Sequence, residues 1–599
     1  MFDYLIKNAN IVDGTGAAAY TASVAVSGDK IAAIIPDSEP LPEAKNVIDA
    51  QGKLLTPGFI DIHSHSDYTM PFWPEFDNNV MQGITTVVAG NCGHGVAPAY
   101  SEEFIESYMM GRLGLRGLLN VQWKSFREWL DYARTLPLGN NYIPLVGHSP
   151  LRGSVLGNDS NLRVSTPEEE EQICVLLQEA LDAGAFGMSY IADPGYPGHW
   201  AAPSEMKKLF KILEERNSYV SAHTRHHQNQ WPSDDGRNYY GVFNGEKGEV
   251  ICGRYHGFVE FIELLEETPK LPGVYAHLTS AFLTPMPHSQ ELENALIDET
   301  LRTFVDEPNN KGMDVYFCII PNPASIGNIQ RVGKDLIASM VFDAELKAFA
   351  TEESLAANLS DASFRAKLKT YINSGKFKMG MLSPATDPYW SDCFTFFTAK
   401  DASLLNRTLM DVTKERHPGI SRHELVYSAC LDVLFDLVLE DPDLEWALTS
   451  DKREYQGIDR LVQHPRCMPM TDATSFPAVG ENKVSIIGGN PPSAYSLFIR
   501  FLTDLCRDKG LIPMEEAFRR MTSLPADIMR IPDRGRIAVG NKADLVLLDW
   551  EKLGYTTDFT KPSTPPSGID YVFVNGTPAL DQGVLTRACT GKVLTRNNT

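Results

Sequence analysis

Short apolar runs rich in β-branched and aromatic residues alternate with amphipathic helical stretches through the middle of the chain. Eight such runs end mostly in polar residues, and they lie at residues 58–66, 84–93, 142–149, 185–192, 219–225, 273–280, 313–320 and 467–475. This alternation is typical of βαβ units joined in a parallel sheet. Eight units predict a (β/α)8 TIM-like barrel, whose reactive groups lie at the carboxyl ends of the strands.

Both ends of the chain carry further short apolar runs that are interrupted by Gly and Asp. Three lie near the N-terminus and three near the C-terminus, at residues 3–12, 22–27, 30–35, 535–550, 570–576 and 583–587. Sets of short strands at opposite ends of a chain suggest one small sheet domain completed by both termini. The sequence therefore predicts an α/β fold in which the barrel is joined to a small β-sandwich.

The expected domain boundaries follow from these runs. Residues 1–55 and 531–599 would form the two parts of the β-sandwich, and residues 56–530 would form the barrel. Residues 321–420 are too many for a simple connection, since most loops in compact domains have about 4–6 residues. An insertion after a barrel strand rises over the active-site face, so this one is interpreted as a lid or substrate-binding subdomain. A structural decoration or a contact between subunits is the alternative.

Charge and composition narrow the classes of partner. The 599 residues include 54 Lys and Arg against 77 Asp and Glu, a formal net charge of −23. The sequence has no basic stripe for phosphates, which excludes a general nucleic-acid binder, and its acidity does not suit an anionic membrane surface. Its start lacks the features of a secretory signal, and no apolar stretch is long enough to span a membrane. With nine scattered cysteines, a cytoplasmic protein without a disulfide framework is expected.

Three residues at the ends of the first two runs have the chemistry of metal ligands. His63 and His65 belong to the first run, and because positions i and i+2 of a strand point the same way, both imidazoles can reach one ion. Cys92 ends the second run, in a turn flanked by Gly90 and Gly93. A thiolate is a good zinc ligand, although a lone buried Cys is more often a small hydrophobic residue.

Three more candidates stand at the ends of later runs. His223 ends the fifth run, His277 the sixth and Asp472 the eighth. Each alone would more often be a satisfied core or surface group. Together with the first two runs, such residues occupy equivalent ends of five of the eight predicted strands, which packing alone does not explain. A catalytic metal centre is the better interpretation.

The order of these residues resembles the amidohydrolase superfamily, which has HxH on barrel strand 1, single histidines on strands 5 and 6 and an aspartate on strand 8. The matching residues are His63, His65, His223, His277 and Asp472. More narrowly, the chain resembles the D-aminoacylase (N-acyl-D-amino-acid deacylase) branch in the segments PGFIDIHSHSD, GITTVVAGNCG, VGHSPLR, AHTR and MTSLPADIMRIPDRGRIAVGNKADLVLLDW. This resemblance extends from near the start of the chain to its end.

The resemblance implies a particular set of metal ligands. Other branches carry a carboxylated Lys on strand 4, but residues 188–190 contain no Lys, and D-aminoacylases use a Cys at the position of Cys92 instead. By this resemblance, Cys92, His223 and His277 would hold one tightly bound zinc ion.

A second, weaker metal position would be lined by His63, His65 and Asp472, with Cys92 as a bridge. Zinc lowers the pKa of bound water towards neutrality and polarises a carbonyl group. Asp472 can accept the proton of the attacking water and deliver it to the departing amine. The expected reaction is therefore hydrolysis of an amide in a small-molecule substrate, an N-acyl amide by the resemblance.

Candidate substrate-binding residues lie close to the strand ends. Tyr196 occupies the loop after the fourth run, where the family has a Tyr-x-Pro-Gly motif, and would hydrogen-bond the substrate or its oxyanion; Tyr190 is a second candidate. Both rings could instead pack the barrel mouth. Arg225 shares the face of His223 and could pair with a substrate carboxylate or form a structural ion pair.

The chain departs from the family at positions near the substrate. Thr279 stands where a Lys that binds the substrate carboxylate is usual, and Thr471 and Ala473 replace the usual Ser and Gly beside the aspartate. These departures indicate that the substrates need not be simple N-acyl-D-amino acids. The alternatives are hydrolysis of an ester, lactone, cyclic amide or carbon–carbon bond at the same site, and a non-catalytic scaffold of the same fold. The oligomeric state is left open.

Overall fold

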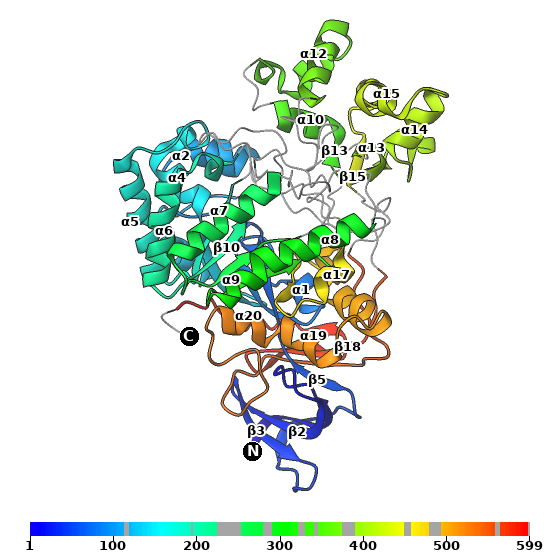
Figure 1. Cartoon of the computed structure of the whole chain (residues 1–599). Helices are drawn as coiled ribbons and strands as arrows, with labels where there is room; N and C mark the ends of the chain where they lie inside the picture. Colours follow the sequence, from blue (N-terminus) through cyan, green and yellow to red (C-terminus); the bar gives the residue numbers. More distant parts are fainter. Residues whose placement is uncertain are drawn as a thin grey trace.

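The structure of the chain, a computed structural model, has three parts that lie in a row in space (Figure 1). A terminal β domain lies at one end, a barrel in the middle and an inserted unit of helices and strands at the other end. The structure describes residues 1–112, 119–192, 196–224, 253–278, 290–321, 330–340, 345–373, 390–448, 457–478, 493–556 and 563–596.

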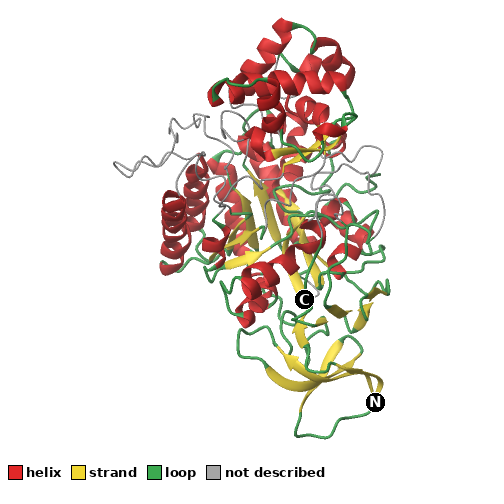
Figure 2. Cartoon of the chain, turned by 90° about the vertical axis from the view of Figure 1, so that its right-hand side faces the viewer, coloured by secondary structure: helices red, strands yellow, loops and turns green. Residues whose placement is uncertain are grey.

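The central part is an eight-stranded sheet whose neighbouring strands are parallel, with helices around it (Figure 2). Its strands are β6 (Phe59–Ser64), β7 (Ile84–Ala89), β8 (Asn141–Gly147), β9 (Gly187–Ile191), β10 (Tyr219–His223), β11 (Gly273–Tyr275), β12 (Val315–Ile319) and β16 (Cys467–Pro469). Each strand falls within one of the predicted apolar runs or overlaps it. The expected (β/α)8 barrel is therefore confirmed.

The first and last strands of the barrel meet at their carboxyl ends. The Asp472 N–H donates to the His63 carbonyl at 3.1 Å, and the His65 N–H donates to the Ala473 carbonyl at 2.8 Å. Buried apolar side chains from several strands, Met468 among them, pack together in one cluster. The barrel is thus a packed core that presents the ends of its strands, as in other barrels of this class.

Helices cover the outside of the barrel. The longer ones are α3 (Phe126–Ala133), α4 (His148–Leu156), α5 (Pro167–Ala183), α6 (Pro203–Glu215), α7 (Gly253–Glu267), α8 (Gln290–Leu301), α18 (Ser493–Arg500) and α19 (Met514–Met521). In α5, Thr166 Oγ1 accepts the Glu169 N–H at 3.3 Å while the Glu169 carboxylate accepts the Thr166 N–H at 2.8 Å. This capping box satisfies donors that the first turn of a helix leaves free. No helix among the described residues is long and apolar enough to cross a membrane.

Further helical segments connect these elements. They are η1 (Ser66–Tyr68), α1 (Asp77–Val80), α2 (Glu102–Phe104), η2 (Ile105–Arg112), η3 (Gly157–Asn161), η4 (Pro197–Trp200), η6 (Arg302–Asp306), α9 (Glu307–Asn310), α17 (Ile458–Val462), η11 (Phe501–Asp508) and α20 (Ser523–Ile528). Of these, η1 begins two residues after the end of β6, and η4 is the next element along the chain after β9.

The terminal β domain is a nine-stranded sheet built from strands near both ends of the chain. Its strands are β1 (Phe2–Ile11), β2 (Tyr20–Ser27), β3 (Lys30–Pro36), β4 (Ala44–Asp49), β5 (Leu54–Pro57), β17 (Leu545–Leu548), β18 (Ile569–Val574), β19 (Thr577–Asp581) and β20 (Val584–Leu585). Strands β5 and β17 join the two ends as antiparallel neighbours, with Leu55 opposite Leu547. The predicted small β domain completed by both termini is therefore confirmed.

Between β12 and β16 the chain forms the inserted unit, at the top of Figure 1. Its elements are β13 (Gln330–Arg331), α10 (Val332–Met340), η8 (Lys347–Phe349), α11 (Glu352–Asn358), α12 (Ala362–Asn373), α13 (Trp390–Cys393), β14 (Phe394–Thr398), η9 (Ala402–Leu404), α14 (Leu409–Arg416), α15 (Arg422–Glu424), η10 (Leu425–Ala429), α16 (Cys430–Glu440) and β15 (Glu445–Leu448). The inserted unit extends past the expected boundary at residue 420, because α16 and β15 bury apolar side chains such as Trp446 in its own hydrophobic core. Its role as a lid stays a prediction.

Candidate metal centre

Six side chains with metal-ligand chemistry meet at the carboxyl ends of five barrel strands. They are His63 in β6, His65 directly after it, Cys92 after β7, His223 at the end of β10, His277 after β11 and Asp472 after β16. Their ligand atoms form two groups that share Cys92, and within each group these atoms lie within 4.8 Å of one another. The structure thus brings together all six residues that the sequence singled out.

The sulfur atom of Cys92 is the centre of the first group. Cys92 Sγ lies 3.3 Å from His277 Nε2 and 3.4 Å from His223 Nδ1. On its other side it lies 3.3 Å from His63 Nε2. A sulfur atom between three imidazole nitrogens is placed to serve two neighbouring metal positions.

A tight turn after β7 presents the Cys92 side chain. Ser189 Oγ accepts the Gly93 N–H at 2.9 Å and donates to the Gly90 carbonyl, so one hydroxyl group holds both flanks of the turn. A Cβ atom on Gly90 would lie 2.3 Å from the Leu145 carbonyl oxygen, which leaves room for Gly alone. The backbone of this turn therefore closely approaches that of β8.

The carboxylate of Asp472 is the centre of the second group. Asp472 Oδ1 lies 3.2 Å from His63 Nε2 and 3.1 Å from His65 Nε2. Burial alone would raise the pKa of Asp472, but the hydrogen bonds with these two imidazoles hold that pKa well below its usual value. Asp472 therefore stays ionised, and its side chain keeps 20% exposure while that of His63 keeps 1%.

The surroundings of His63 favour its neutral ring. Burial lowers the pKa of His63, although the bond to Asp472 opposes this change. The Nδ1 atoms of His63 and His65 are buried without a hydrogen-bond partner among the described residues. A neutral imidazole is the form that binds a metal ion.

Three of the six side chains belong to residues with a left-handed backbone. The φ angles are 51° for Cys92, 35° for His277 and 52° for Asp472. Such a conformation costs on the order of 1–3 kcal/mol for a residue other than Gly and persists only where the surroundings hold it. The backbone at the metal centre is thus strained at the residues that turn their side chains towards the centre.

The donor set fits zinc. One thiol, four imidazoles and one carboxylate, most of them buried, are the ligand types that zinc prefers. A catalytic zinc ion takes three protein ligands and keeps one position open. Cys92, His223 and His277 form one such triple, and the other three side chains line a second position beside it.

Comparison with known proteins assigns the chain to a family. The model of the amidohydrolase family matches residues 46–246 and 481–579. The chain belongs to the amidohydrolase family. This membership confirms the resemblance expected from the order of the histidines and the aspartate along the barrel.

Relatives of this amidohydrolase match it over nearly its whole length. The N-acyl-D-aspartate deacylase of Alcaligenes xylosoxydans xylosoxydans is 26% identical over 97% of this chain and 92% of its own, and the D-aminoacylase of the same organism is 25% identical over 99% and 98%. A crystal structure of D-aminoacylase has a TM-score of 0.67 at 22% identity over 100% of both chains. That of the N-acyl-D-glutamate deacylase from Bordetella bronchiseptica, complexed with zinc and a phosphonate inhibitor, has a TM-score of 0.66 at 23% identity over 99% of both. The expected likeness to the D-aminoacylase branch is confirmed.

The predicted substrate residues of the amidohydrolase lie in different surroundings. Tyr190 of β9 is buried, with its ring centroid 6.1 Å from that of Phe210 on α6 and 6.2 Å from that of Phe261 on α7. This position between strand and helices favours a packing role for Tyr190. Arg225 and Thr279 lie outside the described residues.

An aromatic wall of Tyr68, His94, Tyr108 and Tyr196 stands beside His65. The His94 ring centroid lies 5.8 Å from that of His65 and 5.3 Å from that of Tyr196. His94 Nδ1 lies 2.6 Å from the Tyr108 hydroxyl group, and the Tyr68 ring stacks on His65 with 2° between their planes. The sequence predicted Tyr196 here and missed the other three, although the place of His94, two residues after the cysteine ligand, was a usable signal.

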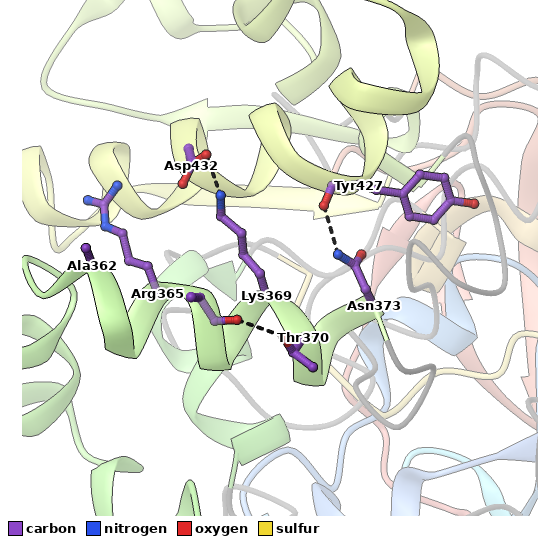
Figure 3. A pocket seen from close by; sticks show the side chains of 8 residues that line it. Ala362, Arg365, Lys369, Thr370, Asn373, Tyr427 and Asp432 are labelled. Carbon is purple, nitrogen blue, oxygen red and sulfur yellow. Dashed lines mark hydrogen bonds and ion pairs between the residues drawn. The ribbon is translucent and has the colours of Figure 1, made fainter.

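A cavity of about 770 Å³ lies in the inserted unit (Figure 3). It is lined from α12 and from the helix that begins at α15, and polar contacts cross it: Lys369 Nζ donates to Asp432 at 2.5 Å, and Asn373 Nδ2 donates to the Tyr427 carbonyl at 2.8 Å. None of its lining residues belongs to the barrel. This cavity is therefore separate from the metal centre.

Proposed function

We propose that this amidohydrolase is a zinc-dependent enzyme that hydrolyses the amide bond of an N-acyl-D-amino acid or of a related N-acyl amide. The observation that carries the proposal is the position of Cys92, which lies between two imidazoles on one side and the group around Asp472 on the other. Family membership and the whole-chain match to a deacylase and an aminoacylase support hydrolysis of a carbon–nitrogen bond that is not a peptide bond.

Asp472 would move the proton in this reaction. When bound, zinc lowers the pKa of water and polarises a carbonyl group. The Asp472 carboxylate is ionised and partly exposed, so it can accept a proton from the attacking water and give it to the departing amine. His63 and His65 hold the carboxylate in place through contacts of 3.2 and 3.1 Å.

Tyr196 and Arg225 are proposed as contacts of the substrate. Tyr196 belongs to the aromatic wall next to His65, which supports a role in binding the acyl group or the substrate oxyanion. Arg225 follows His223 by two residues and would bind the substrate carboxylate, because Thr279 stands where the family usually has a Lys. The substrate is a small molecule in this proposal, and the odd, scattered cysteines suit a cytoplasmic location.

A substrate panel tests the proposal. Zinc-loaded protein is assayed with N-acetyl-D-aspartate, N-acetyl-D-glutamate, N-acetyl-D-leucine and their L-enantiomers, and in parallel with esters, lactones and cyclic imides. We expect release of the free amino acid, with preference for the D-enantiomers, and loss of this activity on chelation with recovery on adding zinc. Asp472→Asn protein purified in parallel controls for contaminating amidases. Turnover of a lactone or imide with no cleavage of any acyl amide would overturn the proposal.

A further inference from the structure

The backbone of Asp472 needs support from its neighbours. Its φ of 52° places a residue with a Cβ atom in the left-handed region, which is unfavourable unless the surroundings fix it. One hydrogen bond, from the Asp472 N–H to the His63 carbonyl at 3.1 Å, ties this residue to the first barrel strand. Further support comes from the residues on both sides of Asp472.

The hydroxyl group of Thr471 reaches across Asp472. Thr471 Oγ1 accepts the Ala473 N–H at 3.2 Å and donates to Asp61 Oδ2. Asp61 Oδ1 in turn accepts the Thr471 N–H at 3.1 Å. The hydroxyl group thus fixes the peptide group that follows Asp472, and the carboxylate fixes both that hydroxyl group and the peptide group between Met470 and Thr471.

The Asp61 carboxylate also fixes the neighbouring strand. Asp61 lies on β6 and is fully buried, and its Oδ1 atom accepts the His63 N–H at 3.3 Å. One carboxylate therefore holds the backbone of a ligand on the first strand and that of the residue next to a ligand on the last strand. These two strands are the ones whose carboxyl ends close the barrel.

We propose that Asp61 and Thr471 form a positioning pair that sets the placement of the Asp472 carboxylate relative to His63, and thereby controls turnover and the affinity of the metal position that Asp472 lines. Asp61 and Thr471 act through their hydrogen bonds to the ligand backbone. The inference rests on the proposed function for its effect on turnover. It also explains one departure of the chain from its family, because Thr at 471 keeps the hydroxyl group that the usual Ser would supply.

Two substitutions at residue 471 distinguish the effect of the hydroxyl group from the effect of the shape of the side chain. Thr471→Val keeps the shape and removes the hydroxyl group, while Thr471→Ser keeps the hydroxyl group. We expect Thr471→Val to lower kcat by about 10- to 100-fold with little change in KM, the range seen when a partner behind a metal ligand is lost. Thr471→Ser should stay close to the wild type.

A metal titration gives a readout that does not depend on turnover. In Thr471→Val, the zinc ion on the Cys92 side should be retained, while binding of a second equivalent to the Asp472 side should weaken by about 10- to 100-fold. A crystal structure of this variant should show Asp472 outside the left-handed region or its carboxylate displaced from His63. In Thr471→Ser, both should match the wild type.

A merely structural role predicts a different pattern. Thr471→Val would then melt at a lower temperature but keep kcat, the second metal affinity and the Asp472 conformation, and this result would overturn the proposal; so would equal impairment of Thr471→Ser. If Thr471→Val does not fold, Asp61→Asn, which keeps the shape of that side chain, should show the same losses. If the wild type cleaves no acyl amide, the proposed function fails. The metal titration and the crystal structure would still test whether Asp61 and Thr471 position Asp472.

Discussion

Two buried clusters near the carboxyl end of the barrel each contain a histidine and a carboxylate, and they differ in how the charge of the carboxylate is balanced. In the metal centre, the Asp472 carboxylate is bound by two imidazole nitrogens. In the second cluster, His148 Nε2 lies 2.6 Å from Glu205 Oε1, and the Arg152 guanidinium pairs with the other oxygen of the same carboxylate. His148 directly follows β8, so its place at a strand end is comparable to that of the metal-centre histidines.

The two clusters differ in the source of positive charge. The positively charged guanidinium of Arg152 pairs with Glu205, and Ser165 Oγ donates a further hydrogen bond to that carboxylate at 2.5 Å. Among the described residues, Asp472 forms ion pairs with imidazoles alone, and these are neutral when they act as ligands. The negative charge of Asp472 therefore lacks a permanent positive partner, which a metal cation can supply. The negative charge of Glu205 already has one in Arg152.

The largest expected effect comes from removing the sulfur atom that the two metal groups share. Cys92→Ala should abolish retention of the tightly bound zinc ion and reduce turnover to background, because a direct ligand is lost. The zinc affinity should fall by more than about 100-fold, the upper range for loss of a partner behind a ligand. Zinc per chain after dialysis, measured by mass spectrometry, checks this prediction.

A cysteine away from the centre provides the matched control. Cys506 is also buried, and its Sγ lies 3.4 Å from the Ile512 carbonyl oxygen in the outer helices. Cys506→Ala makes the same chemical change and should leave the zinc content intact. Zinc retained at the wild-type level by Cys92→Ala would refute the assignment of this ligand.

The next largest effect separates metal binding from proton transfer. Asp472→Asn keeps the size of the side chain and removes its ability to carry a proton, so turnover should fall by about 10²- to 10⁴-fold. The zinc ion on the Cys92 side should remain. Asp335→Asn is the matched control, since Asp335 is a buried carboxylate of the inserted unit that accepts a bond from Trp446 Nε1 at 2.7 Å. Activity of Asp472→Asn near that of the wild type would exclude the proton-transfer role.

The contrast between the clusters also shows which features of this fold can be read from a sequence. The eight barrel strands were predictable because their apolar runs are buried on both faces and bounded by polar strand ends. The six candidate ligands were predictable because they recur at those ends. The strands β4, β5 and β19 of the terminal β domain and β13, β14 and β15 of the inserted unit were missed. Of these, β4 is mostly exposed, so it carries no buried apolar run.

Features that depend on distant partners could not be predicted. Glu205 pairs with His148 across 57 residues of sequence, and the two meet only in the folded chain, where α4 and α6 both pack against α5. The end of the inserted unit depends on whether the residues after 420 pack into the core of the barrel or into that of the inserted unit. The local sequence pattern does not specify this choice. The packing position of Tyr190 also depends on a distant contact. The hydroxyl group of Ser189 holds the Cys92 turn, and Tyr190 faces the opposite side because successive strand residues alternate.

The second cluster should affect stability and not metal binding. Glu205→Gln leaves the buried Arg152 without its counter-charge, and breaking a buried ion pair in this way costs about 3–5 kcal/mol in the free energy of unfolding. Zinc content should stay at the wild-type level. The double variant Glu205→Gln/Arg152→Met, which removes both charges, should be more stable than Glu205→Gln alone. Loss of zinc from Glu205→Gln would show that the two clusters are not independent.

The same substitution should change how stability depends on pH. Burial raises the pKa of Glu205, but the hydrogen bond to His148 and the charge of Arg152 outweigh it and hold that pKa below its usual value. A carboxyl group with a lowered folded-state pKa stabilises the protein above its unfolded-state pKa, about 4.3 for Glu, and this contribution is lost as the pH falls further. In metal-free protein, unfolding by urea should therefore show a steeper loss of stability below about pH 4.3 in the wild type than in Glu205→Gln. Parallel curves for the two proteins would mean that Glu205 does not take up its proton on unfolding, and the charge balance that distinguishes this cluster from the metal centre would then have another origin.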